Sequence, residues 1–154
     1  MWLQITLNIS NCVQYPCNST AYAKLKWAKE KKSQTVMWKK GNLIAGMRYQ
    51  DGNLTILSHG LYFINCQLHF LINNCSEMDG DLHTKLYVNN NIAHQVLNTV
   101  LSTNTSGCKI YKDQHFSLHI ELNASDNVSV QTNFPEFLNE DFLADSFVFE
   151  VFKL

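Results

Sequence analysis

The stretch that decides the fold is RYQDGNLTILSHGLYFINCQL, which runs from Arg48 to Leu68. It predicts two strands joined by a short turn at Ser58-His59-Gly60, and the second strand is unusually long, apolar and aromatic. Such a strand must be covered on both faces. A single chain of 154 residues can cover one face of this strand with the core of one sandwich. The other face is therefore expected to be covered by a partner subunit.

Alternation divides the long strand into two unequal faces. Tyr62, Ile64, Cys66 and Leu68 point to one side, and Phe63, Asn65, Gln67 and His69 point to the other. The first set is the better core, so the second is expected to face neighbouring subunits. Two later strands divide in the same way: Phe116, Leu118, Ile120 and Leu122 oppose His115, Ser117, His119 and Glu121, and Phe147, Phe149 and Val151 oppose Val148, Glu150, Phe152 and Leu154.

The rest of the chain also has the pattern of strands separated by turn-rich pieces. Strands are predicted over residues 21–27, 36–38, 44–49, 53–57, 61–72, 83–89, 93–102, 116–122, 128–132 and 146–154. The one helical competitor is residues 22–32, which are rich in Ala and Lys, and residues 29–35 form a polar, basic connection. About ten strands at this spacing predict an all-β fold, a sandwich or jelly roll of antiparallel strands.

Composition limits the class of protein. Twelve basic and thirteen acidic residues leave the net charge near zero, so nothing favours nucleic acid or an anionic membrane as a partner. Two prolines and six glycines exclude a collagen-like or largely disordered chain. The length predicts one globular domain whose core is large enough to need no metal or cofactor.

Acceptor sequences for N-linked glycosylation indicate the compartment. Seven of the seventeen asparagines begin an Asn-X-Ser/Thr sequon: Asn8, Asn18, Asn53, Asn74, Asn104, Asn123 and Asn127. Chance would place roughly two in a chain of this composition. The chain is therefore expected to pass through the secretory pathway, the alternative being an Asn-rich cytosolic surface. Residues 2–9 are too short for a membrane span and lack a cleavage motif, so a signal or anchor is expected to precede this sequence.

No group of residues has a spacing typical of catalysis or metal binding. Cys12 and Cys17 have no second pair of Cys or His at zinc-finger spacing. Cys66 lies on the core side of the long strand, where a free cysteine behaves as a small hydrophobe and not as a nucleophile. The chain also lacks a Gly-rich phosphate loop and the His-Glu-x-x-His and Gly-x-Ser-x-Gly motifs. We expect no enzymatic activity, no cofactor and no small-molecule substrate.

The long strand also resembles a known family. Gly60-Leu61-Tyr62-Phe63-Ile64, followed by Cys66-Gln67-Leu68, resembles the central strand motif of the tumour necrosis factor superfamily of cytokines. Asp51-Gly52-Asn53-Leu54-Thr55-Ile56 resembles the strand that leads into that motif. Ala21-Tyr22, Trp38 and residues 149–154 are similar to the family's first and last strands. The resemblance covers residues 21–154, and residues 1–20 are expected to be the remnant of a membrane-proximal stalk.

This resemblance implies a compact homotrimer of jelly rolls, displayed outside the cell by a type II membrane anchor that is absent from this sequence. It also implies cytokine activity in immune signalling, in which the trimer binds and clusters cysteine-rich receptor ectodomains in the grooves between its subunits. The trimer interface is then expected to contain Phe63, Asn65, Gln67, His69, His115, His119, Val148, Glu150, Phe152 and Leu154.

The expected interface departs from the family at its centre. Many members carry an aromatic residue at the position of Asn65 and a glycine at that of Glu150, so this axis should be more polar. The three histidines of the expected interface could offset Glu150 or Glu121 by charge-assisted hydrogen bonds, which would make the assembly sensitive to mild acid. The alternative is that these histidines lie at the solvent-exposed end of the interface.

The resemblance also implies one disulfide. Cys75 and Cys108 fall in turn-rich segments flanked by sequons, and these segments match neighbouring loops that several members of the family tie together. Cys12 and Cys17 could pair with each other or link subunits. The count of five cysteines is odd, so at least one thiol is unpaired or intermolecular.

Receptor contacts are implied for three loops, at residues 29–35, 89–92 and 134–145. The residues expected to touch the receptor are Lys31, Lys32, Asn90, Asn91, Ile92, Phe137 and Phe142. Many members place a tyrosine in the second loop, and its absence here puts a single aromatic hot spot in doubt. The lysines suit an acidic receptor surface, and each phenylalanine is either an exposed anchor or packed under its own loop.

Two rival classes share this architecture. The globular heads of complement-like proteins are trimeric jelly rolls, but they usually follow collagen repeats, which this sequence lacks. Glycan-binding lectins are also all-β sandwiches, and a fold does not by itself determine a function.

Overall fold

The computed structural model describes residues 20–39, 43–75, 78, 80–100 and 108–154. Cys12, Cys17, the sequons at Asn8, Asn18 and Asn104, and residues 1–19 of the expected stalk lie outside the described residues. The strands are β1 (Tyr22–Trp27), β2 (Trp38–Lys39), β3 (Ile44–Ala45), β4 (Met47–Gln50), β5 (Asn53–Ile56), β6 (Gly60–Ile72), β7 (Gly80–Val88), β8 (Asn91–Val100), β9 (Ile110–Leu122), β10 (Asn127–Thr132) and β11 (Val148–Lys153). Two short 3-10 turns, η1 (Pro135–Phe137) and η2 (Ala144–Ser146), are the helical segments of this part of the chain.

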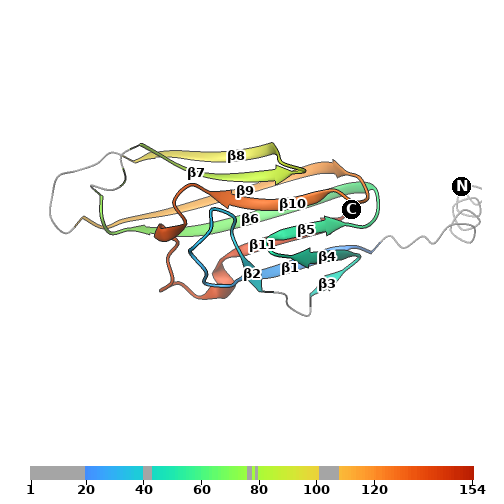
Figure 1. Cartoon of the computed structure of the whole chain (residues 1–154), viewed down its shortest axis with the longest axis horizontal. Coiled ribbons are helices and arrows are strands. Elements are labelled where there is room, and N and C mark those ends of the chain that lie inside the picture. The colour runs from blue at the N-terminus through green and yellow to red at the C-terminus, as the bar shows by residue number, and fades with distance from the viewer. Residues whose placement is uncertain (1–19, 40–42, 76–77, 79, 101–107) are drawn as a thin grey trace, which may run out of the picture.

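The strands form two antiparallel sheets that pack face to face (Figure 1). The first, called here the β6 sheet, has the order β2-β1-β11-β6-β9, with β3 also beside β1. The second, called the β10 sheet, has the order β4-β5-β10-β7-β8. The first and last strands of the domain, β1 and β11, are neighbours in the β6 sheet. The predicted all-β jelly roll is confirmed.

The two strands of the stretch that decides the fold belong to different sheets. β5 pairs with β4 and β10, whereas β6 pairs with β11 and β9. The turn at Ser58-His59-Gly60 therefore carries the chain across the sandwich from one sheet to the other. The Tyr62 hydroxyl donates a hydrogen bond of 2.6 Å to the Ser58 carbonyl and holds this crossing in place.

Alternation places the core where the sequence predicts it. Tyr62, Ile64, Cys66 and Leu68 are almost completely buried between the sheets, as are Phe147, Phe149 and Val151. Burial raises the pKa of the Cys66 thiol, because desolvation disfavours the thiolate. This free cysteine therefore stays protonated and acts as a small core residue, as predicted.

Several predicted strand boundaries differ from the structure; for example, β7 begins at Gly80, three residues earlier than predicted. Gly46 has a φ of +68° and interrupts the predicted strand over residues 44–49, so that β3 and β4 join different sheets. β9 begins at Ile110, six residues earlier than predicted, because its pairing with β6 continues to Ile72↔Ile110. Only Trp38 of the predicted strand over residues 36–38 lies in a strand, β2.

The structure contains the disulfide between Cys75 and Cys108, whose Cα atoms lie 5.9 Å apart. It links the segment after β6 to the segment before β9, 33 residues later. Replacing both cysteines by serine is expected to lower the free energy of unfolding by about 3–4 kcal/mol, because the unfolded chain regains the freedom of that loop. Urea unfolding at one fixed protein concentration measures this loss, and an unchanged midpoint would contradict it.

Candidate functional site

The outer face of the β6 sheet gathers almost all of the residues expected in a trimer interface. β6 contributes Phe63, Asn65 and Gln67, β9 contributes His115 and His119, and β11 contributes Val148, Glu150 and Phe152. These side chains are partly or fully exposed, and they point away from the core. β1 extends the same face with Tyr22, Lys24 and Lys26, because Lys24 pairs with Glu150 in the strand register.

One part of this face is apolar and aromatic. The ring of Phe63 lies 5.4 Å from the ring of Phe152 and 5.4 Å from that of His119, measured between centroids. The same region contains three more exposed apolar residues, Leu61, Tyr22 and Leu154. Leu61 lies on the outward side of β6, and the Leu154 amide donates to the Leu61 carbonyl at 2.8 Å. Tyr22 is the register partner of Phe152. Contiguous apolar side chains on a surface are typical of a protein interface.

A row of polar side chains crosses the same face. The His115 ring donates from Nε2 to Asn65 Oδ1 at 2.7 Å, and the Asn65 amide donates from Nδ2 to Glu150 Oε2 at 3.3 Å. Lys24 Nζ completes the row at 3.5 Å from Glu150 Oε1. Asn65 and Glu150 are therefore paired within one chain, so burying this polar centre would not leave them without partners.

His69 is the one expected interface residue that the structure removes from this face. The residue is only 5% exposed, and its ring is stacked on that of Phe142 with the centroids 4.2 Å apart. Its ring nitrogens bond Asp113 Oδ1 at 2.7 Å and the Ser146 carbonyl at 2.9 Å. The reason is that the segment after Leu138 folds over this end of β6, so the side chain is not open to a neighbour.

The histidines do not offset Glu150 in the way considered from the sequence. The ion pair of Glu150 is with Lys24, and that of Glu121 is with His59 at 3.2 Å. Sequence reasoning missed both partners. Alternation in β1 already placed Lys24 on the polar side of its strand, but only the order of strands in the sheet shows that β1 lies beside β11.

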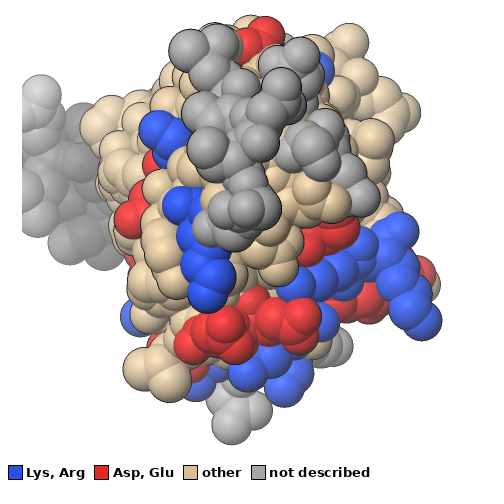
Figure 2. Space-filling model, turned by 90° about the vertical axis from the view of Figure 1, so that its left-hand side faces the viewer, with Lys and Arg blue, Asp and Glu red and all other residues tan. Residues whose placement is uncertain are grey.

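Two of the three expected receptor loops meet at one end of the sandwich. Lys31, from the loop after β1, forms an ion pair of 2.8 Å with Glu140 of the loop before β11. The hydrogen bond and the positive charge of Lys31 lower the pKa of the Glu140 carboxyl. Figure 2 looks at this end and shows basic and acidic side chains interleaved, without one uniform basic patch. Lys32 is exposed, and part of the charge of Lys31 is already paired.

The two phenylalanines of the loop before β11 have different environments. Phe137 is 4% exposed and packs against Phe134, so the expectation of an exposed anchor at this position is wrong. Phe142 is 38% exposed and rests on the ring of His69. Phe137 is buried because η1 folds back onto β6, where Leu138 forms a bridge with Phe70.

The third expected loop, at residues 89–92, lies at the other end of the sandwich (Figure 1). β10 connects the two ends: Thr132 donates to the Gln34 carbonyl of the first loop, and the Asn127 carbonyl accepts from Asn89. The five residue steps between Asn127 and Thr132 span about 17 Å at the usual strand rise. Asn90, Asn91 and Ile92 therefore cannot form one compact patch with Lys31 and Phe142.

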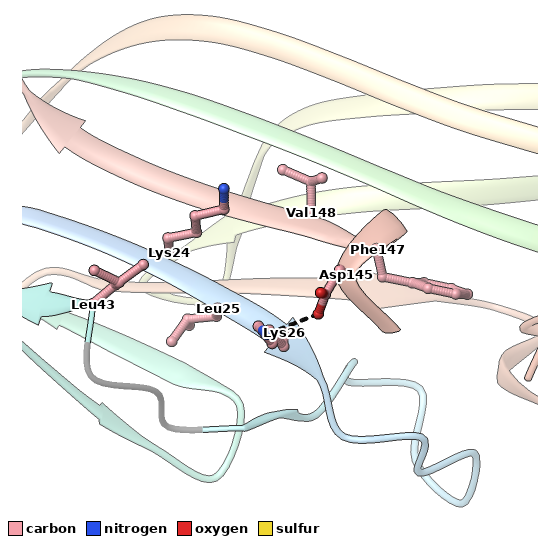
Figure 3. A pocket seen from close by; sticks show the side chains of 7 residues that line it. All are labelled: Lys24, Leu25, Lys26, Leu43, Asp145, Phe147 and Val148. Atoms are coloured by element: carbon pink, nitrogen blue, oxygen red, sulfur yellow. Dashed lines mark ion pairs between the residues drawn. The ribbon is translucent and has the colours of Figure 1, made fainter. Parts of the chain in front are cut away.

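A hollow of about 320 Å³ lies at the margin of the outer face of the β6 sheet, between β1 and the segment around η2 (Figure 3). Lys24, Leu43 and Val148 are among its walls. Lys26 and Asp145 point toward one another across its edge and form an ion pair of 2.9 Å. The hydrogen bond from Lys26 lowers the pKa of Asp145. These two residues were not predicted, because no sequence signal relates a strand residue to a loop more than a hundred positions away.

The fold and this face define a class of protein: an all-β jelly roll whose outer sheet face is exposed, partly aromatic and partly polar. Comparison with known proteins identifies the family. The family model of the tumour necrosis factor family matches residues 25–154, and the chain belongs to this family. "Tumor necrosis factor ligand superfamily member 8" of the mouse, which is the CD-thirty ligand, is 37% identical to the chain over 112 residues. The match covers 71% of this chain and 46% of the mouse protein, so the chain spans about half the length of that relative.

Membership of this family favours the cytokine over the complement-like head and the lectin. Ligands of the family are extracellular or cell-surface proteins, and they are cytokines and not enzymes. Within the described ranges, no helix is both long enough and apolar enough to cross a membrane.

Proposed function

We propose that this chain is the receptor-binding domain of an extracellular cytokine, which assembles as a homotrimer and clusters a cysteine-rich receptor of the tumour necrosis factor receptor family on immune cells. The CD-thirty receptor is the proposed partner, because the CD-thirty ligand of the mouse is 37% identical to this chain over 112 residues. The observation that carries the proposal is the outer face of the β6 sheet, where an exposed aromatic group around Phe63 lies beside a row of paired polar side chains.

The trimer is supported by the chemistry of that face. Its apolar part, around Phe63 and Phe152, would be removed from water on assembly. This burial contributes a favourable free energy of about 25 cal/mol for each Å² of apolar surface. In its polar part, Asn65 and Glu150 already have partners within one chain, so burial would not leave these two side chains unpaired. The proposed interface therefore keeps the residues expected from the sequence, with His69 replaced by Lys24 and Tyr22.

Receptor binding is proposed for the two ends of the groove between subunits. At one end Lys31, Lys32 and Phe142 are available, and at the other Asn90, Asn91 and Ile92 are exposed. Phe137 has a supporting role instead, because it is buried and packs against Phe134 within the same loop. The separation of the two ends suits an elongated receptor that touches both.

The proposed setting is the cell surface, with a type II anchor preceding the domain. Asn53, Asn74, Asn123 and Asn127 are all exposed in the structure, as glycosylated asparagines must be. The mass of the secreted domain, corrected for glycans, followed by binding to a panel of receptor ectodomains, tests the whole proposal. A monomer that binds no member of the panel would overturn it.

Phe142→Ala is expected to raise the receptor dissociation rate about tenfold, because a half-exposed aromatic ring at an interface contributes on the order of 1–2 kcal/mol. Surface plasmon resonance with captured trimer measures the rate, and light scattering confirms that the trimer mass is unchanged. Leu97→Ala, on the outer face of the β10 sheet, serves as the control and should leave the rate unaltered. Equal dissociation rates for Phe142→Ala and the unmodified protein would show that Phe142 and its loop do not contribute to receptor binding.

A further inference from the structure

The turn between β7 and β8, at the right-hand end of β7 in Figure 1, is held rigidly against the start of β10. Asn89 and Asn90 form a two-residue turn with φ values of +50° and +68°, as expected for a tight hairpin. The Asn89 amide donates to Asp126 Oδ1 at 2.6 Å, and its Oδ1 accepts from the Asn127 backbone at 2.9 Å. The position of this turn is therefore fixed relative to Asn127.

Two sequons of the chain lie beside that turn. Asn127 is the register partner of Thr55, which is the third residue of the sequon that begins at Asn53. The Thr55 hydroxyl donates to Asn127 Oδ1 at 2.7 Å, so the two sequons share the outer face of the β10 sheet. Asn53, Thr55, Asn127, Asn89 and Asn90 are among the residues that line a polar hollow of about 480 Å³.

The acceptor atoms of both sequons are available in the folded chain. N-linked glycosylation uses the side-chain amide nitrogen, which displaces the pyrophosphate of a lipid-linked oligosaccharide from its anomeric carbon and loses one proton. The hydrogen bond of the Asn127 side chain uses Oδ1 and leaves Nδ2 free to carry a sugar. Asn53 Nδ2 makes only a long contact of 3.5 Å with the Asp51 carbonyl. A glycan on either asparagine therefore displaces no strong contact.

We propose that N-linked glycans on Asn53 and Asn127 flank this hollow together and cover the β7–β8 turn, including Ile92. Asn127 faces Thr55 across the β5–β10 strand pair, and Asn53 lies two residues from Thr55 along β5. The first sugars therefore have a polar surface of amides and hydroxyls to lie against. The proposal rests on passage through the secretory pathway, which is part of the proposed function. It makes glycosylation a regulator of access to one of the two ends where receptor contact is proposed.

Ile92 and Leu97 provide a matched pair of probes for shielding of the β7–β8 turn by the two glycans. They are 51% and 49% exposed on the same strand, β8. A register shift between Leu86 and Tyr87 places Ile92 opposite Tyr87, and Leu97 lies opposite His83, so both are on the outer face of the β10 sheet. Ile92 is next to the turn, whereas Leu97 lies about 17 Å further along the strand.

The test is hydroxyl-radical footprinting of the protein secreted from mammalian cells, after glycopeptide mass spectrometry has established which sequons are occupied. Four variants are compared with the unmodified protein. Two are double variants: Thr55→Ala with Ser129→Ala removes both sequons and leaves both asparagines, and Thr55→Ser with Ser129→Thr keeps both. The other two are the single variants Thr55→Ala and Ser129→Ala, which show the share of each glycan. Trimming the unmodified protein with an endoglycosidase that leaves one sugar gives a further sample in which no residue is changed.

Oxidation of Ile92 relative to Leu97 is expected to rise about twofold or more when both glycans are absent or trimmed, and to stay low in the Thr55→Ser, Ser129→Thr protein. Equal oxidation ratios in all samples, or secreted protein with both asparagines unmodified, would overturn the proposal. The readout needs no receptor, so failure to bind any receptor would count against the proposed function alone. Trimming also keeps the test valid if the alanine variants fold poorly.

Discussion

Phe63→Glu is expected to convert the assembled protein into monomers. Phe63 lies at the centre of the aromatic part of the outer face, with Phe152 and His119 on either side of its ring. A glutamate there would be buried in the proposed interface once per subunit, and an unpaired buried charge costs several kcal/mol. Light scattering at micromolar protein concentration should report the mass of one chain in place of three.

A matched control separates assembly from folding in this experiment. Leu97→Glu introduces the same charge on the outer face of the β10 sheet, where Leu97 is half exposed and no trimer contact is proposed. It should leave the mass at three chains. Circular dichroism should show the same strand content for both variants, because neither position is in the core. If Phe63→Glu remains a trimer, the outer face of the β6 sheet is not the assembly surface.

Phe147→Ala is expected to lower the free energy of unfolding by about 3–5 kcal/mol, the usual cost of removing a buried aromatic ring. Phe147 is almost completely buried and stacks on Trp27, with ring centroids 4.3 Å apart. Its ring edge also meets His69, at 5.2 Å and an angle of 87°. The residue therefore joins β1 and β6 to the segment that follows η2.

Urea unfolding at fixed protein concentration measures this loss, with Leu143→Ala as the control. Leu143 lies in the same loop but is 76% exposed, so its truncation should change the free energy of unfolding by less than about 0.5 kcal/mol. Receptor binding by Phe147→Ala should also weaken at temperatures where the protein remains folded, since Phe142 rests on the same His69 ring. Equal unfolding midpoints for the two variants would show that the loop is held by other contacts.

Much of the core and of the outer face was predictable because strands alternate with a period of two. That period alone separates Tyr62 and Ile64 from Phe63 and Asn65, and it gives the same division in β9 and β11. The period is a local property of an extended backbone, so it requires no knowledge of neighbouring strands. The sequons indicated the expected compartment for a similar reason, since they can be read from the chain directly.

His69 and Phe137 show where alternation fails. His69 has the parity of the outer face, yet the segment around Phe142 and Ser146 covers it. Phe137 belongs to a loop with no period at all, and η1 folds it inward. In both cases the burial is decided by a segment far away in the sequence, whose path no local pattern describes.

The sequence by itself determined the all-β class, the division of each long strand into a core side and an outer side, and the resemblance to a family, because these depend on neighbours within a few positions. Only the tertiary structure decided which strands lie side by side, and hence that Lys24 pairs with Glu150 and that the expected receptor loops occupy two separate ends. The physical reason is that sheet order and loop packing depend on the total free energy of long-range contacts, which no short window of sequence contains.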